Sequence, residues 1–314
     1  MTRRTALSAL ALALSLSFAP ALRSFSAGAQ ELPLRLPVKA DSIRFLVIGD
    51  TGTGDSGQYE TASVIIKYRE KFPFTFALML GDNMYGSERP QDFLNKFERP
   101  YKKLLDDKVE FDAALGNHDD PNQIYYKPFN LGGKRYRTFK KGDVRFFALD
   151  SNYLDPEQLQ WLEKELQSSG SDWKIAYFHH PMYSSAYHGP TIEVRNALEP
   201  LFQKYNVDVV FAGHEHVYER IYPQKGIYYF VQGGSAKLRA NDVKRSAQTA
   251  AAFDTDRSFM LVEISGDEMF FQTISRKGAT VDSGVVPRRK VRTDLQRSAE
   301  AGGSAPAKAA PATK

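Results

Sequence analysis

Short apolar runs alternate with segments of helical periodicity along most of the chain. Runs such as IRFLVIG (43–49) and VDVVFAG (207–213) are nearly continuous in Val, Ile, Leu and Phe, which is typical of strands buried on both faces. The segment that Pro156 opens has the spacing and the first-turn proline of a helix. The predicted strands are 43–49, 74–80, 110–115, a hairpin over 134–150, 173–178, 207–213, 226–233, 258–265 and 268–275. The predicted helices are 58–69, 92–105, 155–166 and 191–204.

The order of these elements predicts the fold class. Strand–helix alternation followed by a strand-rich final third indicates a layered α/β architecture with mixed sheets. In such folds the loops that follow parallel strands gather at one edge of the sheet, where ligands usually bind. We therefore expect the chemistry of the protein to lie at the strand ends.

The first residues have the features of an export signal. Arg3 and Arg4 precede an apolar stretch, and small residues offer a cleavage site after Ala29. The arginine pair fits a twin-arginine leader as well as a plain secretory signal, and the sequence leaves that choice open. We expect residues 1–29 to be a signal peptide of a periplasmic or secreted protein, with no stable membrane insertion after its removal.

The net charge of +5 is concentrated at the two ends of the chain. The leader carries three arginines and the tail from Pro287 a surplus of five positive charges, so residues 30–286 have a net charge of −3. A mildly acidic body without a basic patch argues against nucleic acid as a partner. The Ala-, Pro- and Lys-rich tail, 287–314, is predicted to be disordered, and residues 38–286 to form one folded domain.

Five of the predicted strands end in side chains that can bind metals. These stretches are GDTG (49–52), GDNMY (81–85), GNHDD (116–120), HHPMY (179–183) and GHEH (213–216). Five of the six histidines lie in them, and the sixth, His188, follows the fourth stretch closely. The chain has no cysteine, which excludes thiolate sites. Carboxylates, imidazoles and one amide suit divalent or trivalent metals, and so many donors indicate two metals that share a carboxylate.

Each of these residues also has an ordinary structural explanation. Asp50 is consistent with capping the helix that follows it, and Asn117 with stabilising its own turn. Tyr85 alone would be expected to pack in a core, and His188 to be solvated in a loop. Five such stretches in sequence order would require five independent coincidences, which favours the metal site.

The ordered set GDTG, GDNMY, GNHD, FHHP and GHEHVYER resembles the calcineurin-like metallophosphoesterase superfamily, specifically its purple acid phosphatase branch. The resemblance spans residues 50–220. The wider superfamily has a histidine ligand at the position of Gly52, whereas the purple acid phosphatases have glycine there and a tyrosine at the position of Tyr85. This sequence has both features of the branch. The resemblance implies an αββα sandwich of two mixed β-sheets flanked by helices, with residues 38–286 as the catalytic domain.

The resemblance also implies two metal ions joined by a bridging carboxylate. The ligands it implies for the first metal are Asp50, Asp82, Tyr85 and His216. Those it implies for the second metal are Asp82, Asn117, His179 and His214. In the family one residue separates the third-segment histidine from a proline, which selects His179 before Pro181. His180 is then expected to be a packing residue or a neighbour of the ligands, because adjacent strand residues point to opposite faces.

The metals and the reaction follow from the same resemblance. A tyrosine loses its proton near pH 7 only beside a strong cation, since its free pKa is roughly 10, so Fe(III) with a divalent partner (Fe, Zn or Mn) is implied. In the family the metal pair activates a hydroxide that attacks the phosphate. Histidines at the positions of His118 and His188 contact the substrate or protonate the leaving group.

The function expected is therefore an exported acid phosphatase that hydrolyses small phosphate monoesters. The same metal pair also serves phosphodiesters and nucleotides, which is the first alternative. The second alternative is a protein that binds metal or a phosphorylated ligand without turnover. The sequence does not identify the physiological ester or the oligomeric state.

Overall fold

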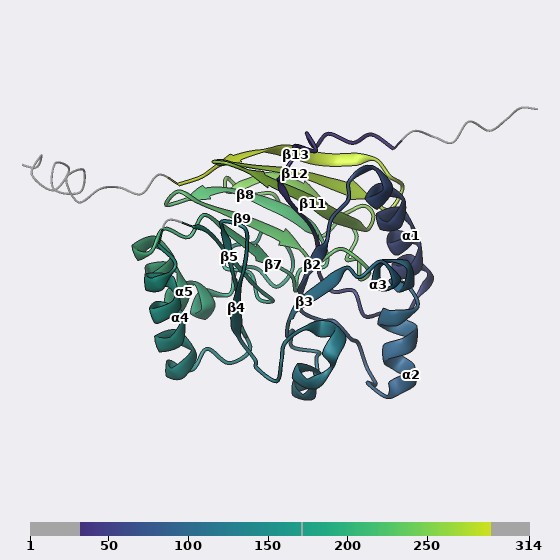
Figure 1. Cartoon of the computed structure of the whole chain (residues 1–314), viewed down its shortest axis with the longest axis horizontal. Helices are drawn as coiled ribbons and strands as arrows, with labels where there is room; N and C mark the ends of the chain where they lie inside the picture. Colours follow the sequence, from purple (N-terminus) through teal and green to yellow (C-terminus); the bar gives the residue numbers. More distant parts are fainter. Residues whose placement is uncertain (1–31, 171, 290–314) are drawn as a thin grey trace, which may run out of the picture. The chain divides into compact units, whose positions relative to one another are not determined.

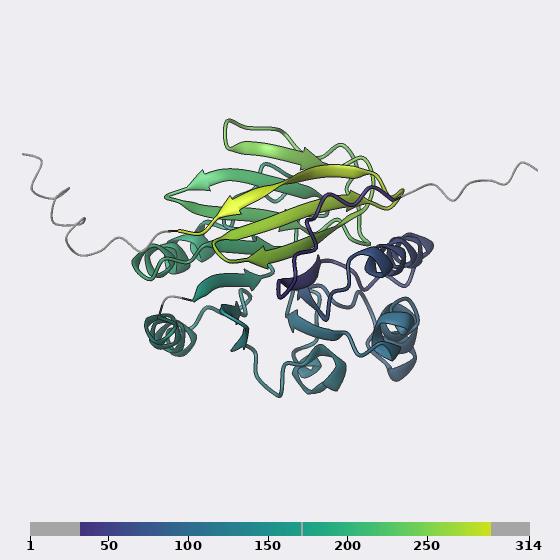
Figure 2. The ribbon, with the colours of Figure 1, turned by 45° about the horizontal axis from the view of Figure 1, so that its top comes forward.

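Two mixed β-sheets pack face to face, and helices cover both outer faces (Figure 1 and Figure 2). The computed structural model describes residues 32–170 and 172–289, so the predicted signal peptide and nearly all of the predicted tail lie outside the described residues. The arrangement is an αββα sandwich, which confirms the expected fold class.

The first sheet has the strand order β13-β12-β11-β1-β2-β3. Its strands β1, β2 and β3 are parallel neighbours, while β11 pairs antiparallel with β1 and leads into an antiparallel meander through β13. The bounds are Ile43–Ile48 (β1), Phe76–Leu80 (β2), Glu110–Ala114 (β3), Ser258–Ser265 (β11), Glu268–Ser275 (β12) and Thr280–Pro287 (β13).

The second sheet has the strand order β10-β8-β9-β7-β6-β5-β4. Its central strands β5, β6, β7 and β9 are parallel, and the antiparallel strands lie on either side of them. The bounds are Arg137–Lys141 (β4), Val144–Ala148 (β5), Trp173–Phe178 (β6), Val209–Ala212 (β7), Tyr218–Gln224 (β8), Ile227–Gln232 (β9) and Thr249–Phe253 (β10). Each sheet therefore has its own set of parallel strand ends.

The layers are held together by three apolar cores. The core between the sheets is rich in aromatic rings, where Phe45 stacks on Phe76 at 5.1 Å and meets the edge of Phe146 at 5.5 Å. One outer core lies between the first sheet and α1, and the other lies between the second sheet and α4 and α5. The helix bounds are Ser56–Lys71 (α1), Pro90–Phe93 (α2), Lys102–Asp106 (α3), Pro156–Ser168 (α4) and Ile192–Lys204 (α5), with shorter 3₁₀ turns at Pro121–Tyr125 (η2) and Lys127–Phe129 (η3).

The predicted helix over 92–105 is interrupted. A π-helix, η1 (Leu94–Glu98), separates α2 from α3, and the amide of Arg99 donates to the carbonyl of Leu94 at 2.9 Å. Pro100 follows directly and has no amide hydrogen, so a regular α-helical hydrogen-bond ladder cannot pass through it. The apolar periodicity is correct here, but the proline breaks the helix.

Three strands were not predicted from the sequence. Two of them, β10 and β13, lie at sheet edges, where one face and one edge meet solvent and the apolar pattern is weak. The third, β8, includes the buried carboxylate of Glu219, which breaks the expected apolar-inside alternation. These strands extend the sheets but leave the predicted strand ends where they were expected.

The packed region extends beyond both predicted boundaries, 38 and 286. On the N-terminal side, Leu36 is buried against the core beside α1, and the backbone amides of Val38 and Lys39 donate to Glu263 at 2.8 and 2.5 Å. On the C-terminal side, the amide of Arg289 donates to Asp208 at 2.9 Å. Among the described residues, no helix has the length and apolar character needed to cross a membrane.

We expect the segment 32–39 to contribute to the stability of the fold. Removing it uncovers the contact surface of Leu36 and leaves the buried carboxylate of Glu263 without two donors. Loss of a buried leucine costs about 2 kcal/mol, and an unsatisfied buried acceptor about 1–3 kcal/mol. A chain that begins at Ala40 should therefore have a free energy of unfolding in urea at least about 3 kcal/mol below that of a chain that begins at Leu32. Equal unfolding midpoints for the two chains would show that the segment is dispensable.

Candidate metal centre

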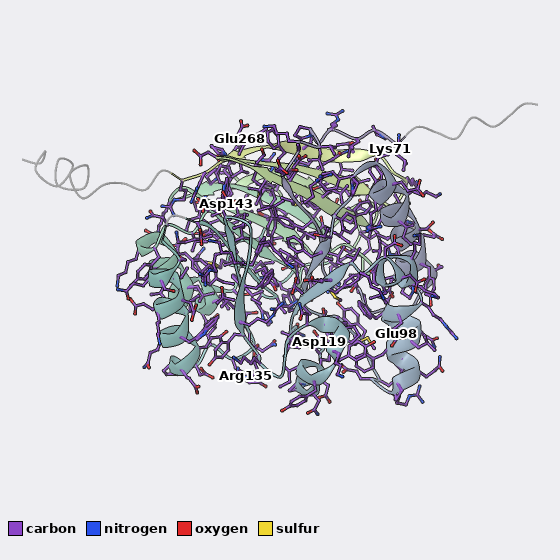
Figure 3. All side chains as sticks on the ribbon, in the orientation of Figure 1. Lys71, Glu98, Asp119, Arg135, Asp143 and Glu268 are labelled. Atoms are coloured by element: carbon purple, nitrogen blue, oxygen red, sulfur yellow. The ribbon has the colours of Figure 1, made fainter. Side chains whose placement is uncertain are left out.

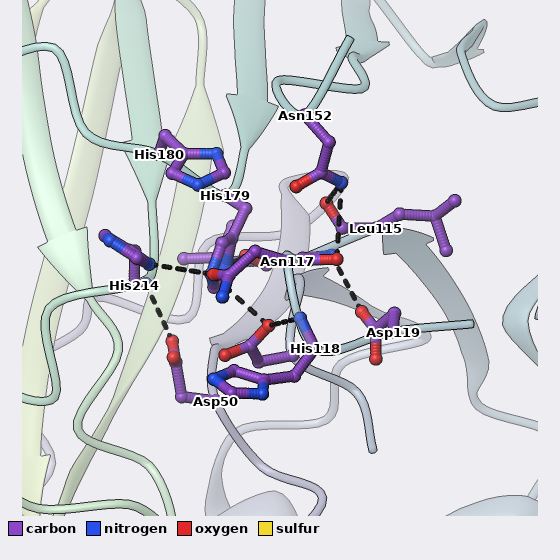
Figure 4. Close-up of polar contacts among 12 residues, drawn as sticks. Asp50, Leu115, Asn117, His118, Asp119, Asn152, His179, His180 and His214 are labelled. Carbon is purple, nitrogen blue, oxygen red and sulfur yellow. Dashed lines mark hydrogen bonds and ion pairs between the residues drawn. The ribbon is translucent and has the colours of Figure 1, made fainter. Parts of the chain in front are cut away.

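Polar side chains from both sheets meet where the strands end (Figure 4). The first sheet contributes the loops after β1, β2 and β3, and the second contributes the loops after β6 and β7. All seven predicted metal ligands lie in these loops, namely Asp50, Asp82, Tyr85, Asn117, His179, His214 and His216.

The backbone at three of these residues is held in the left-handed region. The φ angles are 55° at Asp50, 50° at Asp82 and 69° at His214. A non-glycine residue in this conformation costs roughly 1–2 kcal/mol, and such strain gathers at functional sites. The amide of His214 donates to Asp50 Oδ2 at 2.9 Å, so the strained loops of the two sheets also hold each other in place.

Glycines let these loops approach one another closely. A Cβ atom added at Gly116 would lie 2.2 Å from the amide nitrogen of Asp82, and one at Gly213 would lie 2.7 Å from Asp50 Oδ2. Both distances are shorter than real contacts allow, so a side chain at either position would push a carboxylate out of place.

A first cluster of donor atoms contains Asp50, Tyr85 and His216. The Tyr85 hydroxyl donates to Asp50 Oδ1 at 2.9 Å and lies 3.2 Å from His216 Nε2. His216 Nε2 is also 3.4 Å from the same carboxylate oxygen. A carboxylate, a phenol and an imidazole therefore point at one small volume, as ligands of a single ion do.

Gly52 leaves room for the loop that carries Tyr85. The amide of Tyr85 donates to the Gly52 carbonyl at 3.0 Å. A Cβ atom at position 52 would lie 2.1 Å from the carbonyl oxygen of Asn83 and 2.3 Å from Met84 Cα. A side chain at position 52 and the observed course of the Tyr85 loop therefore exclude each other.

A second cluster contains Asn117, His179 and His214. Asn117 Oδ1 lies 2.9 Å from His179 Nε2 and 3.0 Å from His214 Nδ1. His179 places its other ring nitrogen, Nδ1, 2.9 Å from the carbonyl of Leu80, which requires that nitrogen to be the donor. In the neutral ring, Nε2 then carries a lone pair that faces the lone pairs of the Asn117 amide oxygen. A cation between the two atoms would stabilise this arrangement.

Asp82 lies between the two clusters. Its Oδ1 atom is 3.3 Å from His179 Nε2 and accepts a hydrogen bond from the amide of His118 at 3.0 Å. One ligand atom each from Asp50, Asp82 and His179 can be chosen so that all lie within 4.8 Å of one another. The geometry therefore suits two ions that share this carboxylate.

The electrostatics of the site also suit cations. Burial, and next the charge of Asp82, raise the pKa of Asp50, and burial with both carboxylates raises the pKa of Tyr85. Burial and the neighbouring imidazoles lower the pKa of His214 to about 2, and burial lowers the pKa of His179. The imidazoles are thus neutral and ready to bind a metal, while the crowded acids ionise readily only beside positive charge.

The two histidines predicted to act on the substrate flank the clusters. The ring of His118 lies 5.0 Å from the ring of Tyr85, and the ring of His188 lies 4.4 Å from the ring of His214. His188 directs Nδ1 toward the buried carboxylate of Glu215 at 3.3 Å. Its Nε2 atom has no hydrogen-bond partner within residues 32–170 and 172–289 and can meet a ligand.

His180 also approaches the second cluster. Its ring lies 4.6 Å from that of His214, and its ligand atom could join His179 and His214 around one ion. The alternation of strand faces does not separate His179 from His180, because β6 ends at Phe178 and both residues lie in the loop beyond it. His180 differs in that its Nδ1 atom is bonded to Ser151 Oγ at 2.9 Å.

Asp119 is a structural residue of the site that the sequence reasoning did not assign. Its carboxylate accepts from the amide of Gly116 at 2.7 Å, from the amide of Met84 at 2.9 Å and from the side chain of Gln123 at 2.8 Å. Burial and the charge of Asp82 raise the pKa of Asp119 to about 8. The residue ties the Tyr85 loop to the Asn117 loop, and its only sequence signal is its place in GNHDD.

A cavity of about 660 Å³ lies beside the second cluster and is bounded by Asn117 and His180. Asp119 and Arg135 also line it, and Figure 3 shows both on the side of the fold away from Glu268. The charge of Arg135 is neutralised within the protein, since its guanidinium is paired with Asp150 at 2.8 Å. The lining also includes the carboxylate of Glu193, so the cavity is polar, has no unpaired positive charge and suits the organic part of a ligand.

Comparison with known proteins gives consistent results. Residues 43–218 match the family model described as calcineurin-like phosphoesterase. Human tartrate-resistant acid phosphatase type 5 is 28% identical over 312 residues, covering 82% of this chain and 95% of the relative. Purple acid phosphatase 17 of Arabidopsis thaliana is 27% identical over 246 residues, covering 66% of this chain and 72% of the relative.

Solved structures show the same fold at lower identity. The purple acid phosphatase PPD1 from yellow lupin seeds has a TM-score of 0.66 at 21% identity, covering 81% of this chain and 55% of that chain. GAP50, the anchor in the inner membrane complex of Plasmodium, has a TM-score of 0.69 at 19% identity, covering 79% of this chain and 90% of that chain.

We expect the chain to bind two metal ions and to lose one of them in His179→Ala. His180→Ala is the matched control, because the Nδ1 atom of His180 is already bonded to Ser151, and it should retain both ions. Elemental analysis after dialysis gives the stoichiometry, and the rise in Tm on metal addition should shrink only in the His179 variant. Loss of an ion in His180→Ala with retention in His179→Ala would reverse the assignment.

Proposed function

The chain belongs to the calcineurin-like phosphoesterase family and is a hydrolase, and from this premise we propose that it is an exported acid phosphatase acting on phosphate monoesters through two metal ions. The resemblance seen in the sequence is confirmed by the family match. The observation that carries the finer proposal is the tyrosine hydroxyl of Tyr85 beside Asp50 and His216, opposite a glycine at position 52.

The ligand sets follow the two clusters of donor atoms. Asp50, Tyr85 and His216 would hold the first metal, and Asn117, His179 and His214 would hold the second. Asp82 would contribute its carboxylate to both. In support of this division, the contacts of the Tyr85 hydroxyl are with the first cluster and those of the Asn117 amide oxygen are with the second. Asp82 Oδ1 lies 3.3 Å from His179 Nε2 of the second cluster.

The first metal is Fe(III) and the second is divalent (Fe, Zn or Mn). A phenol that is buried among carboxylates ionises only beside a strongly charged ion. With Asp50, Asp82 and Tyr85 ionised, such a pair keeps a net charge of about +2, which favours a phosphate dianion. When bound, the metals supply a hydroxide nucleophile at neutral pH and neutralise charge on the phosphate.

The protein's own side chains complete the site. The His118 ring lies next to the Tyr85 ring, and the His188 ring lies against the His214 ring, so each borders one metal position. With Nδ1 facing the Glu215 carboxylate, His188 can carry a second proton at Nε2 as an imidazolium, and the leaving oxygen takes that proton. The cavity beside Asn117 accommodates the leaving alcohol.

Export rests on the leader-like sequence at residues 1–29, which lie outside the described residues. A removable leader with small residues before the cleavage point is consistent with a periplasmic or secreted enzyme. The substrate would then be a small phosphate ester that is available outside the cytoplasm.

We expect the metal-loaded protein to contain about one iron per chain and to be pink or purple through a Tyr85-to-iron charge-transfer band. Tyr85→Phe should lose the visible band while the other ligands remain. Tyr222→Phe is the matched control, because Tyr222 is 54% exposed on β8 and should keep the colour. A colourless but active enzyme that holds only zinc or manganese would contradict the iron assignment.

We expect turnover of aryl phosphate monoesters to exceed that of bis-aryl phosphodiesters. His188→Ala should lower kcat by roughly 10²–10⁴ on an alkyl phosphate, whose leaving group needs a proton, and much less on p-nitrophenyl phosphate. An equal loss on both esters would remove His188 from proton transfer. Turnover of neither ester class by metal-loaded protein would contradict the proposed function.

A further inference from the structure

A short segment after β9 carries two basic side chains along the first metal position. The segment is fixed by its backbone, because the amide of Lys237 donates to the carbonyl of Asp50 at 3.1 Å and the amide of Arg239 donates to the carbonyl of His216 at 3.1 Å. Two residues assigned to the first metal are therefore hydrogen-bonded directly to the residues that carry these cations.

The side chains of both residues extend along aromatic rings at this position. Lys237 Nζ lies 4.6 Å from the centre of the Tyr85 ring, and the guanidinium of Arg239 lies 4.1 Å from the centre of the Tyr187 ring. Tyr187 is 69% exposed and precedes His188, so Arg239 borders the solvent-facing side of the site. Stacking on rings keeps a cation oriented without neutralising it.

Neither cation has an ion-pair partner among the residues described. By contrast, other basic residues of the C-terminal half are neutralised, such as Arg220 by Asp282 at 2.8 Å and Lys225 by Glu199 at 2.7 Å. Glu215 lies close enough to feel the charge of Arg239 but faces His188 at 3.3 Å and forms no ion pair with the guanidinium. The charge of the segment is available to a ligand.

We propose that Lys237 and Arg239 form a subsite for a second anionic group of the substrate, a carboxylate or a second phosphate next to the phosphate that is hydrolysed. This inference rests on the proposed function and specifies its substrate class. The metal pair itself binds the phosphate that is hydrolysed, so two additional cations without ion-pair partners at its border suit an ester that carries a further anionic group. Arg239 presents a planar fork that matches the oxygens of a carboxylate or phosphate, and Lys237 adds a point charge.

The position of the cavity supports this division of the site. The cavity lies beside Asn117 at the second metal, and its basic residue Arg135 is paired with Asp150. It therefore suits the uncharged part of a leaving group. Lys237 lies at Tyr85 beside the first metal position, and Arg239 lies on Tyr187 next to His188, so the anionic part of a substrate is directed to this basic border and away from the cavity.

The test compares two substrates that differ in one group, 3-phosphoglycerate and glycerol 3-phosphate. The wild-type enzyme should prefer the carboxylate-bearing compound by about tenfold or more in kcat/KM, since a charge-assisted contact contributes at least this factor. Lys237→Gln with Arg239→Gln should abolish the preference through a higher KM for 3-phosphoglycerate, while turnover of glycerol 3-phosphate stays within about twofold. Pyrophosphate in a third arm distinguishes a second phosphate from a carboxylate as the preferred group.

Two further variants separate local contact from general charge. Lys67→Gln on α1 with Lys164→Gln on α4 makes the same change in net charge at exposed positions and should leave the preference unchanged. Lys237→Arg keeps a positive charge at this position and should retain most of the preference for 3-phosphoglycerate. The inference is overturned if the wild-type enzyme prefers neither 3-phosphoglycerate nor pyrophosphate over glycerol 3-phosphate. It is also overturned if the double variant keeps the wild-type preference.

Failure of the proposed function is recognisable separately. Metal-loaded protein that turns over neither glycerol 3-phosphate nor 3-phosphoglycerate contradicts phosphatase activity. The subsite is then judged by calorimetric affinity for the same two compounds, where a preference of about tenfold that the double variant loses supports it and equal affinities overturn it.

Discussion

The crowding of buried acids at the ends of β1 and β2 is the constraint on which the site depends. Asp50 and Asp82 are almost fully buried, and the Tyr85 hydroxyl is directed at the same oxygens. In a space shielded from water, repulsion between two carboxylates is far stronger than at a surface. Neutral imidazoles with inward lone pairs surround them and supply no compensating charge. The arrangement favours bound cations as the element that holds it together.

The fold gives this crowding the support it needs. Strand ends from two different sheets must meet, and the aromatic core between the sheets fixes their relative position. Left-handed backbone at Asp50, Asp82 and His214 costs roughly 1–2 kcal/mol per residue, and the large cores around the site offset that cost. Asp119 then joins two of the loops through its carboxylate. Rigidity at the strand ends is thus a property of the whole sandwich.

The sequence was most informative where a strand ends in an unusual residue. The runs before Asp50 and His214 are long, apolar and followed by glycine-bordered polar residues, so both strand and site could be predicted. Asp119 could not be assigned, because its role depends on amides from another loop, which no local pattern reveals. His180 is a neighbour of the cluster as expected, but the alternation of strand faces is not the cause, since β6 ends at Phe178. Edge strands and the break at Pro100 were missed because their apolar signal is weak or interrupted.

The lack of space at Gly52 also bears on how such a protein can change over generations. The backbone of Asn83 and Met84 occupies the volume that any side chain at position 52 would need. A histidine there and the present course of the Tyr85 loop are therefore alternative solutions that no single substitution can interconvert. A lineage with this backbone would have to rebuild two separated loops together, so the combination of Gly52 with Tyr85 is inherited as a block and resists gradual drift.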